Sequence, residues 1–164
     1  ISFDPNLRLS LWKTPEEARR RILYGMKQCD IMKISEEEVA FVSEQESLEK
    51  GVSFIRDNSD IKILFVTLGN KGSIAYYKDE KIYCGGIHQE HVVDTTGAGD
   101  TFCGAVLSRI LELGTDALTE KDIREMLLFA NAAASIVVTR KGALCSMPEP
   151  EEIRAATSLI DKVL

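Results

Sequence analysis

One stretch of the sequence combines small residues and an acid in a way that suits chemistry on an anion. It spans residues 94–105 and contains Gly97, Ala98 and Gly99, followed directly by Asp100. Small residues let backbone N–H groups approach a ligand closely, and a helix start favours negative charge. Bound phosphate would repel an acid, so Asp100 is better explained as a base that takes a proton from an attacking hydroxyl. The alternative is that the glycines only shape a turn and that Asp100 caps a helix.

The same stretch can be compared with known phosphate-binding motifs. The chain has no GxxxxGK[ST] sequence, so this is not the loop of a Walker-type nucleotide-binding protein. Residues 94–105 instead resemble, position for position, the second signature of the ribokinase-like (PfkB) carbohydrate kinases. The resemblance includes Gly104 and Ala105, a small pair that would let the helix pack closely. It implies that the three small residues before Asp100 form an anion hole and that Asp100 is the catalytic base.

Two further segments resemble the nucleotide-binding parts of this family. Residues 66–72 resemble its nucleotide loop, which implies ATP contacts from Thr67, Gly69 and Gly72. A G-x-x-G turn at the carboxyl end of a strand is where open α/β sheets bind ligands, although such a short motif is often only a turn. Residues 129–134 resemble the helix that lines the adenine pocket, with Asn131 facing the base. A small-residue helix face that permits close packing is the alternative there, and both interpretations can hold together.

Residues 33–38 resemble the N-x-x-E motif of the family. The resemblance implies that Glu38 helps to organise hydrated magnesium near the phosphates, which fits the tendency of Mg²⁺ to keep its waters. Ser35, which the resemblance places among the nucleotide-binding residues, occupies the position where the family usually has Asn, so only Glu38 matches the motif fully. The alternative is a capping box on a surface helix, in which Ser35 and Glu38 satisfy each other's backbone N–H groups.

Residues 4–8 resemble a motif that is prominent in the fructokinase branch. Arg8 suits a phosphate contact, because a guanidinium forks onto two oxygens; a solvated Arg after a turn is the alternative. The wider run of residues 4–12, with the segment 33–38, resembles fructokinases more than ribokinases. This subfamily resemblance favours fructose as the sugar.

Residues 139–143, including Ala143, and Ser146 resemble a loop that binds a monovalent cation in ribokinase-like enzymes. Oxygen ligands suit a hard cation such as K⁺. The resemblance implies that Asp94 and Thr96 complete this site, with backbone carbonyls from Val137, Arg140 and Gly142. A basic surface turn is the alternative.

Strands that alternate with helices must position these residues. Caps and breakers predict helices over 14–28, from Ser35, over 45–56, up to Leu113 with Gly114 as its stop, over 118–138 and over 148–163. Apolar runs and turns predict strands over 1–3, 30–34, 61–67, 73–77, 81–84 and 89–94. The pattern indicates an α/β protein with a mainly parallel sheet. The resemblance implies a ribokinase-like three-layer sandwich, of which residues 1–164 are one α/β nucleotide-binding and catalytic portion.

Composition excludes several partners. With 26 acidic and 20 basic residues, the net charge of −6 argues against nucleic acid and against an anionic membrane. No apolar run is long enough to cross a bilayer, and no signal peptide is visible. Four scattered cysteines without metal-ligand spacing favour free thiols in a reducing cytoplasm: Cys29, Cys84, Cys103 and Cys145.

The predicted function is ATP-dependent phosphoryl transfer to a sugar hydroxymethyl group, with Mg²⁺ and K⁺, and with fructose giving fructose 6-phosphate. A ribokinase, a 2-keto-3-deoxygluconate kinase and a non-catalytic nucleotide-binding module remain alternatives, and a homodimer remains open. The chain begins without Met inside a strand-like pattern, and it resembles only the C-terminal half of the family. We therefore expect the N-terminal half and the lid to lie outside it, and residues 1–164 alone to be nearly inactive.

Overall fold

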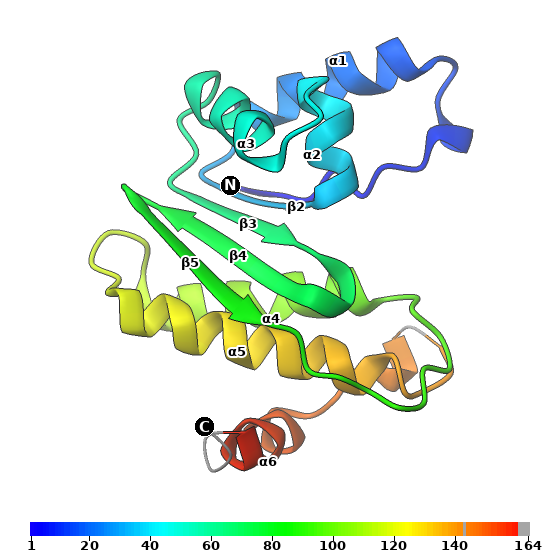
Figure 1. The fold of residues 1–164 in the computed structure, drawn as a ribbon, viewed down its shortest axis with the longest axis vertical. Coiled ribbons are helices and arrows are strands. Elements are labelled where there is room, and N and C mark those ends of the chain that lie inside the picture. Colours follow the sequence, from blue (N-terminus) through cyan, green and yellow to red (C-terminus); the bar gives the residue numbers. More distant parts are fainter. Residues whose placement is uncertain (143, 161–164) are drawn as a thin grey trace. The chain divides into compact units, whose positions relative to one another are not determined.

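The computed structural model describes residues 1–142 and 144–160 (Figure 1). The chain divides into two compact units, the first made of residues 1–68 and 75–81 and the second of residues 69–74 and 82 onward. Two strands, β4 (Gly72–Tyr77) and β5 (Glu80–Gly85), contribute residues to both units. The prediction of a single α/β portion therefore stays a prediction.

The first unit is built on three parallel strands. β1 (Ser2–Phe3), β2 (Ile31–Ser35) and β3 (Ile63–Thr67) lie side by side, and β2 pairs with β3 over its whole length. Four of the five β3 residues are buried, as expected for an apolar strand of a parallel sheet. The helices of this unit lie together on one side of these strands (Figure 1): η1 (Leu9–Leu11), α1 (Pro15–Met26), α2 (Glu36–Ser43) and α3 (Leu48–Asp57).

Side-chain caps fix where these helices begin. The Thr14 hydroxyl accepts the Glu17 N–H at the start of α1, and Pro15 takes the first helical position, where its missing N–H is harmless. Ser35 caps α2, and Ser47 caps α3. The helices bury an apolar core with the strands, whose largest members include Met26, Met32, Ile34, Ile55 and Phe65.

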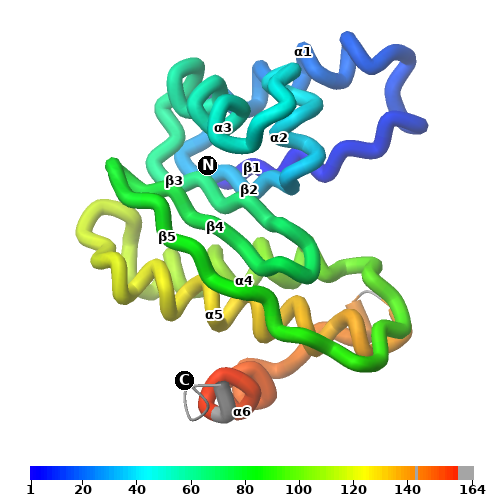
Figure 2. Tube along the Cα trace, viewed as in Figure 1, coloured from blue at the N-terminus to red at the C-terminus, as the bar shows by residue number. Residues whose placement is uncertain are grey.

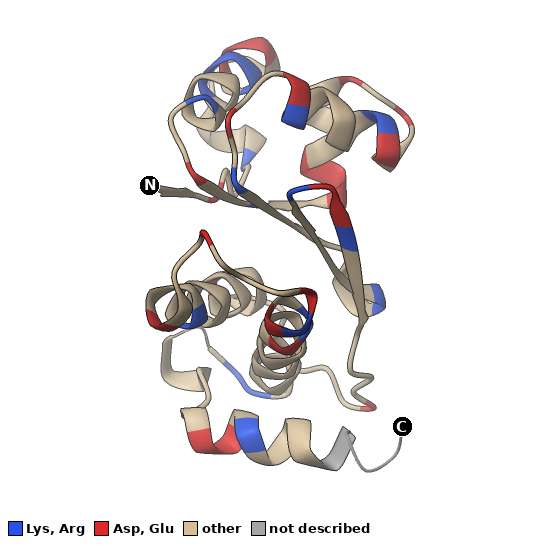
Figure 3. Cartoon of the chain, turned by 90° about the vertical axis from the view of Figure 1, so that its left-hand side faces the viewer, with Lys and Arg blue, Asp and Glu red and all other residues tan. Residues whose placement is uncertain are grey.

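The second unit is dominated by two long helices packed side by side (Figure 2), α4 (Ala98–Leu113) and α5 (Glu120–Val137). Three shorter elements complete it: η2 (Gly69–Lys71), η3 (Leu144–Ser146) and α6 (Pro150–Ile160). Gly114 ends α4 with a φ of 77°, which a glycine adopts without strain. The core of this second unit is lined by Phe102, Val106, Ile123, Met126 and Leu127. Figure 3 shows acidic and basic residues interspersed on the helices of each unit.

The described strands form one sheet in the order β1-β2-β3-β4-β5. Residues 68–71 join β3 to β4, and two residues join β4 to β5. Connections this short join antiparallel neighbours, so β5 again runs in the direction of β1 to β3. The sheet is therefore mixed and mostly parallel.

Two expectations from the sequence are wrong. Residues 89–94 form no strand, although the N–H groups of Val93 and Asp94 both donate to the Val138 carbonyl, at 2.8 and 3.2 Å. Gly104 is exposed, and a Cβ built there would meet nothing within 4 Å in the described chain, so it is not a close-packing position. The helix expected over 148–163 is α6, and its predicted last residues lie outside the described ones.

Candidate active site

The start of α4 is an open helix N-terminus. The cap residue is Gly97, which has no side chain to accept a backbone N–H. The first bonds of the turn run from the Ala98 N–H to the Thr95 carbonyl, at 3.3 Å, and from the Thr101 N–H to the Gly97 carbonyl, at 2.8 Å. The N–H groups of Gly99 and Asp100 fall among the first four of a helix, which have no intrahelical partner. This end of α4 can therefore donate to an anion.

Asp100 lies in the first turn of α4 and is exposed. Because Gly97 is the cap residue, the alternative that Asp100 caps the helix is not what the structure has. Gly97 has φ 85° and ψ −5°, in the left-handed region. An L-residue there would cost about 1–2 kcal/mol, so this position requires glycine. The Asp100 carboxylate is thus accessible beside uncapped backbone donors.

Asp94 ties the loop before α4 to the loop after α5. Its Oδ1 accepts the Thr96 N–H at 2.9 Å. This bond, followed by weaker contributions that include the Gly142 N–H and the Lys141 charge, lowers the pKa of the Asp94 carboxyl. Asp94 is therefore a carboxylate at neutral pH, as a cation ligand must be.

The expected cation loop is partly closed on itself. The Ser146 hydroxyl is buried and donates to the Gly142 carbonyl, and the Arg140 N–H donates to the Val137 carbonyl at 3.0 Å. The Arg140 guanidinium pairs with Glu152 at 2.5 Å. Each carbonyl keeps a second lone pair, so the oxygen donors still fit a hard cation. Ala143 lies outside the described residues.

The expected nucleotide loop packs backbone against backbone. Gly69 and Gly72 have φ values of 60° and 109°, which favour glycine. A Cβ at Gly72 would lie 2.1 Å from the Cys84 carbonyl oxygen. The Gly86 N–H donates to the Lys71 carbonyl at 3.0 Å, and a Cβ at Gly86 would lie 2.2 Å from the Asn70 carbonyl oxygen. The loop can thus sit against the end of β5 only because both positions lack side chains.

Asn131 of α5 is 7% exposed, and both the oxygen and the nitrogen of its amide are hydrogen-bonded. Its Oδ1 accepts the Ser73 hydroxyl at 2.9 Å, and its Nδ2 donates to the carbonyls of Cys84 and Gly85, each at 3.2 Å. The amide therefore ties α5 to the start of β4 and the end of β5. Contact with an adenine stays a prediction, and these bonds leave the amide few free hydrogen-bonding positions.

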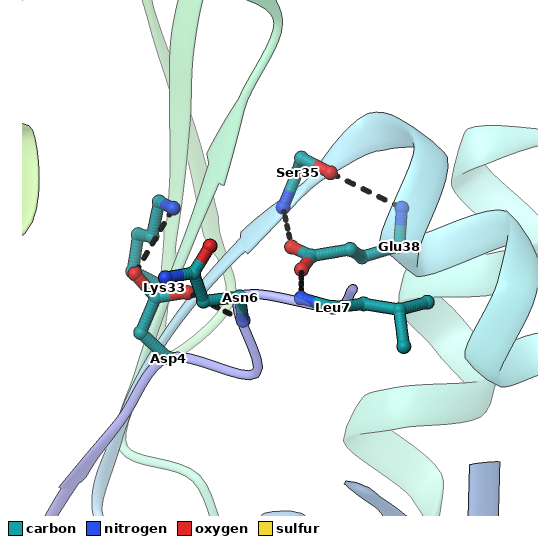
Figure 4. A network of polar contacts seen from close by, with 6 residues as sticks. All are labelled: Asp4, Asn6, Leu7, Lys33, Ser35 and Glu38. Atoms are coloured by element: carbon teal, nitrogen blue, oxygen red, sulfur yellow. Dashed lines mark hydrogen bonds and ion pairs between the residues drawn. The ribbon is translucent and has the colours of Figure 1, made fainter. Parts of the chain in front are cut away.

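The first unit holds the remaining predicted residues (Figure 4). Glu38 is 9% exposed, and each of its oxygens accepts one backbone N–H: Oε1 from Leu7, at 2.6 Å, and Oε2 from Ser35, at 2.8 Å. The Ser35 hydroxyl accepts the Glu38 N–H at 3.2 Å, which completes a capping box. The capping box that the sequence left as the alternative is therefore present, but its Glu is buried. With both oxygens occupied, Glu38 fits a magnesium site through water better than as a direct ligand.

Each unit therefore gathers its own set of predicted residues. The second unit contains the open start of α4, the loop from Gly69 to Gly72, Asn131 and the cation loop with Asp94 and Thr96. The first contains Arg8, Ser35, Glu38 and Thr67. Arg8 is exposed and has no ion-pair partner within residues 1–142 and 144–160, while Thr67 is half-buried at the end of β3.

Sequence reasoning missed three polar residues. Lys33 is 8% exposed, and its Nζ pairs with Asp4 Oδ2 at 3.1 Å. A lysine inside an otherwise apolar strand was the signal for this pair. The Thr101 hydroxyl, next to Asp100, is buried without a hydrogen-bond partner in the described part of the chain. Nothing in the sequence indicated this, nor the bond of Ser73 to Asn131, because both depend on tertiary packing.

Comparison with known proteins shows that the chain is similar in sequence and structure to fructokinases and to a riboside kinase. Fructokinase-1 of Zea mays is 42% identical over 155 residues, which are 93% of this chain and 47% of that protein. The crystal structure of Vibrio cholerae fructokinase, with fructose, ADP and calcium ion bound, is 33% identical, with a TM-score of 0.85 over 95% of this chain and 50% of that one. The crystal structure of aminoimidazole riboside kinase of Salmonella enterica is 27% identical, with a TM-score of 0.82 over 96% of this chain and 52% of that one.

The model of the pfkB family of carbohydrate kinases matches residues 1–150, and the chain belongs to this family. It spans about half the length of the curated relatives it matches. These matches confirm the predicted fold class, a ribokinase-like α/β fold, of which this chain spans about half. No helix within the described residues is long and apolar enough to cross a membrane.

Proposed function

We propose that this protein is an ATP-dependent sugar kinase, that its sugar is fructose, and that its product is fructose 6-phosphate. The observation that carries the proposal is the start of α4, where the exposed carboxylate of Asp100 stands beside uncapped backbone N–H groups. Membership of the pfkB family and the fructokinase relatives support the reaction and the choice of sugar.

In the proposed mechanism, Asp100 accepts the proton of the sugar hydroxyl as that oxygen attacks the γ-phosphorus of ATP. The bond from the γ-phosphorus to the bridging oxygen breaks, and ADP leaves with that oxygen. The N–H groups from Gly97 to Asp100 donate to the phosphoryl oxygens, on which negative charge spreads in the transition state. A Mg²⁺ ion bound with ATP would neutralise part of that charge. Asp94, Thr96 and the carbonyls of Val137, Arg140 and Gly142, with Ser146, would hold K⁺ beside the loop.

The first test replaces Asp100 by Asn in the full-length protein and measures fructose phosphorylation. General-base catalysis typically contributes about 10²- to 10⁴-fold, so we expect kcat to fall by that factor while nucleotide affinity stays nearly unchanged. Glu112→Gln is the matched control, because it removes one carboxylate from the same helix away from its N-terminus. Near-normal turnover by Asp100→Asn would show that Asp100 is not the base.

The second test separates an enzyme from a non-catalytic nucleotide-binding module. Calorimetric titration with Mg-ADP should give saturable one-to-one binding, and turnover should appear with at least one sugar from a panel of fructose, ribose and 2-keto-3-deoxygluconate. Binding without turnover by the full-length protein would favour the module. A faster rate with ribose or 2-keto-3-deoxygluconate would keep the kinase and replace fructose.

Residues 1–164 alone are expected to be nearly inactive, because the chain spans about half the length of its relatives. Measurable turnover by this segment would contradict that expectation. We also place the protein in the cytoplasm, with no nucleic acid or membrane partner, in keeping with its acidic composition. Sedimentation of the full-length protein decides between monomer and homodimer.

A further inference from the structure

The segment of residues 4–8 is held at two points by β2 and α2 (Figure 4). Lys33, in β2, pairs through its Nζ with Asp4 Oδ2 at 3.1 Å. Glu38, in the first turn of α2, accepts the Leu7 N–H on Oε1 at 2.6 Å. The two contacts lie three residues apart, so they fix both ends of the short run between Asp4 and Leu7.

The backbone between these two points has an uncommon conformation. Asn6 has a φ of 41°, and its N–H donates to Asp4 Oδ1 at 3.1 Å. A positive φ is disfavoured for a residue with a side chain, although Asn tolerates it better than most. Such a conformation persists where its surroundings determine it, and functional sites are a common setting for it. Lys33 and Glu38 supply that constraint from outside the segment.

The charges of this cluster are largely buried. Lys33 is 8% and Glu38 9% exposed, and Asp4 is half-buried. Burial raises the pKa of the Asp4 carboxyl, which the Lys33 ammonium partly offsets. Buried charged groups are a weak source of stability compared with apolar residues of similar size. Their presence here indicates a role in holding one particular conformation.

The residue that this conformation presents is Arg8. It directly follows the anchored amide of Leu7, and its carbonyl accepts the N–H of Leu11, the last residue of η1, at 2.9 Å. Its backbone is therefore fixed on both sides. The guanidinium is exposed and has no ion-pair partner in the described ranges. An arginine whose backbone is fixed and whose guanidinium N–H groups are exposed is suited to bind the oxygens of a phosphoryl group.

We propose that Glu38 is a positioning residue, which holds the Leu7 amide and thereby places Arg8 against a phosphoryl group. Lys33 supports the same segment through Asp4. The inference rests on the proposed kinase function and gives Glu38 a role that needs no metal. Each Glu38 oxygen is already occupied by a backbone donor, one of them from the segment that carries Arg8.

The first experiment tests the contact itself by hydrogen exchange of the full-length protein, followed by mass spectrometry of a peptide that covers residues 4–11. Glu38→Gln keeps the shape of the side chain but offers one acceptor oxygen for two N–H groups. We expect the peptide to exchange at least several-fold faster in this variant. Glu37→Gln, on the neighbouring exposed position, is the matched control and should match the wild type. Unchanged exchange in Glu38→Gln would overturn the proposal.

The second experiment is a double-mutant cycle of kcat/KM with Arg8→Gln and Glu38→Gln. Each single replacement removes a hydrogen bond of a charged side chain. We therefore expect each to lower kcat/KM by about tenfold relative to the wild type. If Glu38 acts through Arg8, Glu38→Gln should lower kcat/KM less than about twofold once Arg8 is replaced. Multiplicative effects, or a Glu38→Gln defect that excess Mg²⁺ repairs, would overturn the proposal.

The two arms separate the proposal from the kinase function on which it rests. If Arg8→Gln raises the KM for ATP, Arg8 contacts the bound nucleotide. If it lowers kcat at saturating ATP, Arg8 contacts the phosphoryl group that is transferred. A wild-type protein without sugar-kinase turnover would overturn the proposed function and, with it, the phosphoryl role of Arg8. The exchange measurement would still decide whether Glu38 holds the segment.

Discussion

Replacement of Asn131 should destabilise the second unit through three hydrogen bonds that end on one buried amide. Truncation to Ala removes the bond to Ser73 and the bonds to the carbonyls of Cys84 and Gly85. Ser73 is fully buried, so its hydroxyl would be left without a partner, at about 1–3 kcal/mol. Cys84 and Gly85 are reached by solvent, so water can replace the amide at their carbonyls, and losing these two bonds costs less free energy.

The free energy of unfolding of Asn131→Ala is therefore expected to lie about 2–3 kcal/mol below that of the wild type. For a chain of this size, 1 kcal/mol shifts Tm by roughly 2–4 °C, which predicts a fall of about 5–10 °C. Asn131→Asp should lower Tm further. It has almost the same shape, but it turns a carboxylate toward two carbonyl oxygens where the amide donated.

The assay is thermal unfolding at neutral pH, with Ser135→Ala as the matched control. Ser135 is also buried on α5, but within the described residues its hydroxyl bonds only to the Ala132 carbonyl of its own helix. That variant should change Tm little. In a Ser73→Ala background, Asn131→Ala should cost about 1 kcal/mol less than in the wild type. If Asn131→Asp were as stable as the wild type, the account of this tether would be refuted.

Three further outcomes are expected. Gly72→Ala should lower Tm strongly, because its Cβ would lie 2.1 Å from the Cys84 carbonyl oxygen. Gly104→Ala should raise stability by up to about 1 kcal/mol, because its Cβ would meet no other part of the described chain within 4 Å and Ala is the better helix former. Equal Tm values for the two variants would contradict the packing described. The Thr119 hydroxyl and N–H lower the pKa of Asp122, so this cap stabilises the fold above the usual Asp pKa of about 3.9 and its contribution is lost as pH falls through the lowered folded value. The Tm gap between wild type and Asp122→Asn should therefore close in acid, and a gap that stayed constant down to pH 2 would contradict it. Gly97→Ala should weaken Mg-ADP binding, measured by calorimetry, because φ 85° disfavours Ala; binding equal to the wild type would argue against that loop as the anion site.

Local chemistry made much of the fold predictable. Ser35 and Glu38 have the spacing of a capping box, and the structure has that box at the start of α2. Thr14, Pro15 and Gly114 likewise mark the ends of α1 and α4 where the structure has them. These signals succeed because the interacting groups lie within one turn of each other.

The failures come from contacts between residues distant in the sequence. Residues 89–94 look like a strand, but their described partner is the carbonyl of Val138 at the end of a helix, not a neighbouring strand. The second bond of Glu38 reaches back 31 residues to Leu7, and Asn131 bonds to Ser73 across 58 residues. Periodicity and caps carry no information about such partners. The roles proposed for Asp100, Arg8 and the cation loop therefore depend on family resemblance and stay predictions.

The absence of a side-chain cap at Gly97 has a consequence for how this region responds to its ligand. Four of the six described α-helices satisfy a terminal N–H with a Ser or Thr cap, whereas α4 has no side-chain cap. An anion bound there, as proposed, would stabilise this turn by an amount that grows with the ratio of ligand concentration to Kd. The degree of order in the first turn of α4 would then rise with the nucleotide concentration.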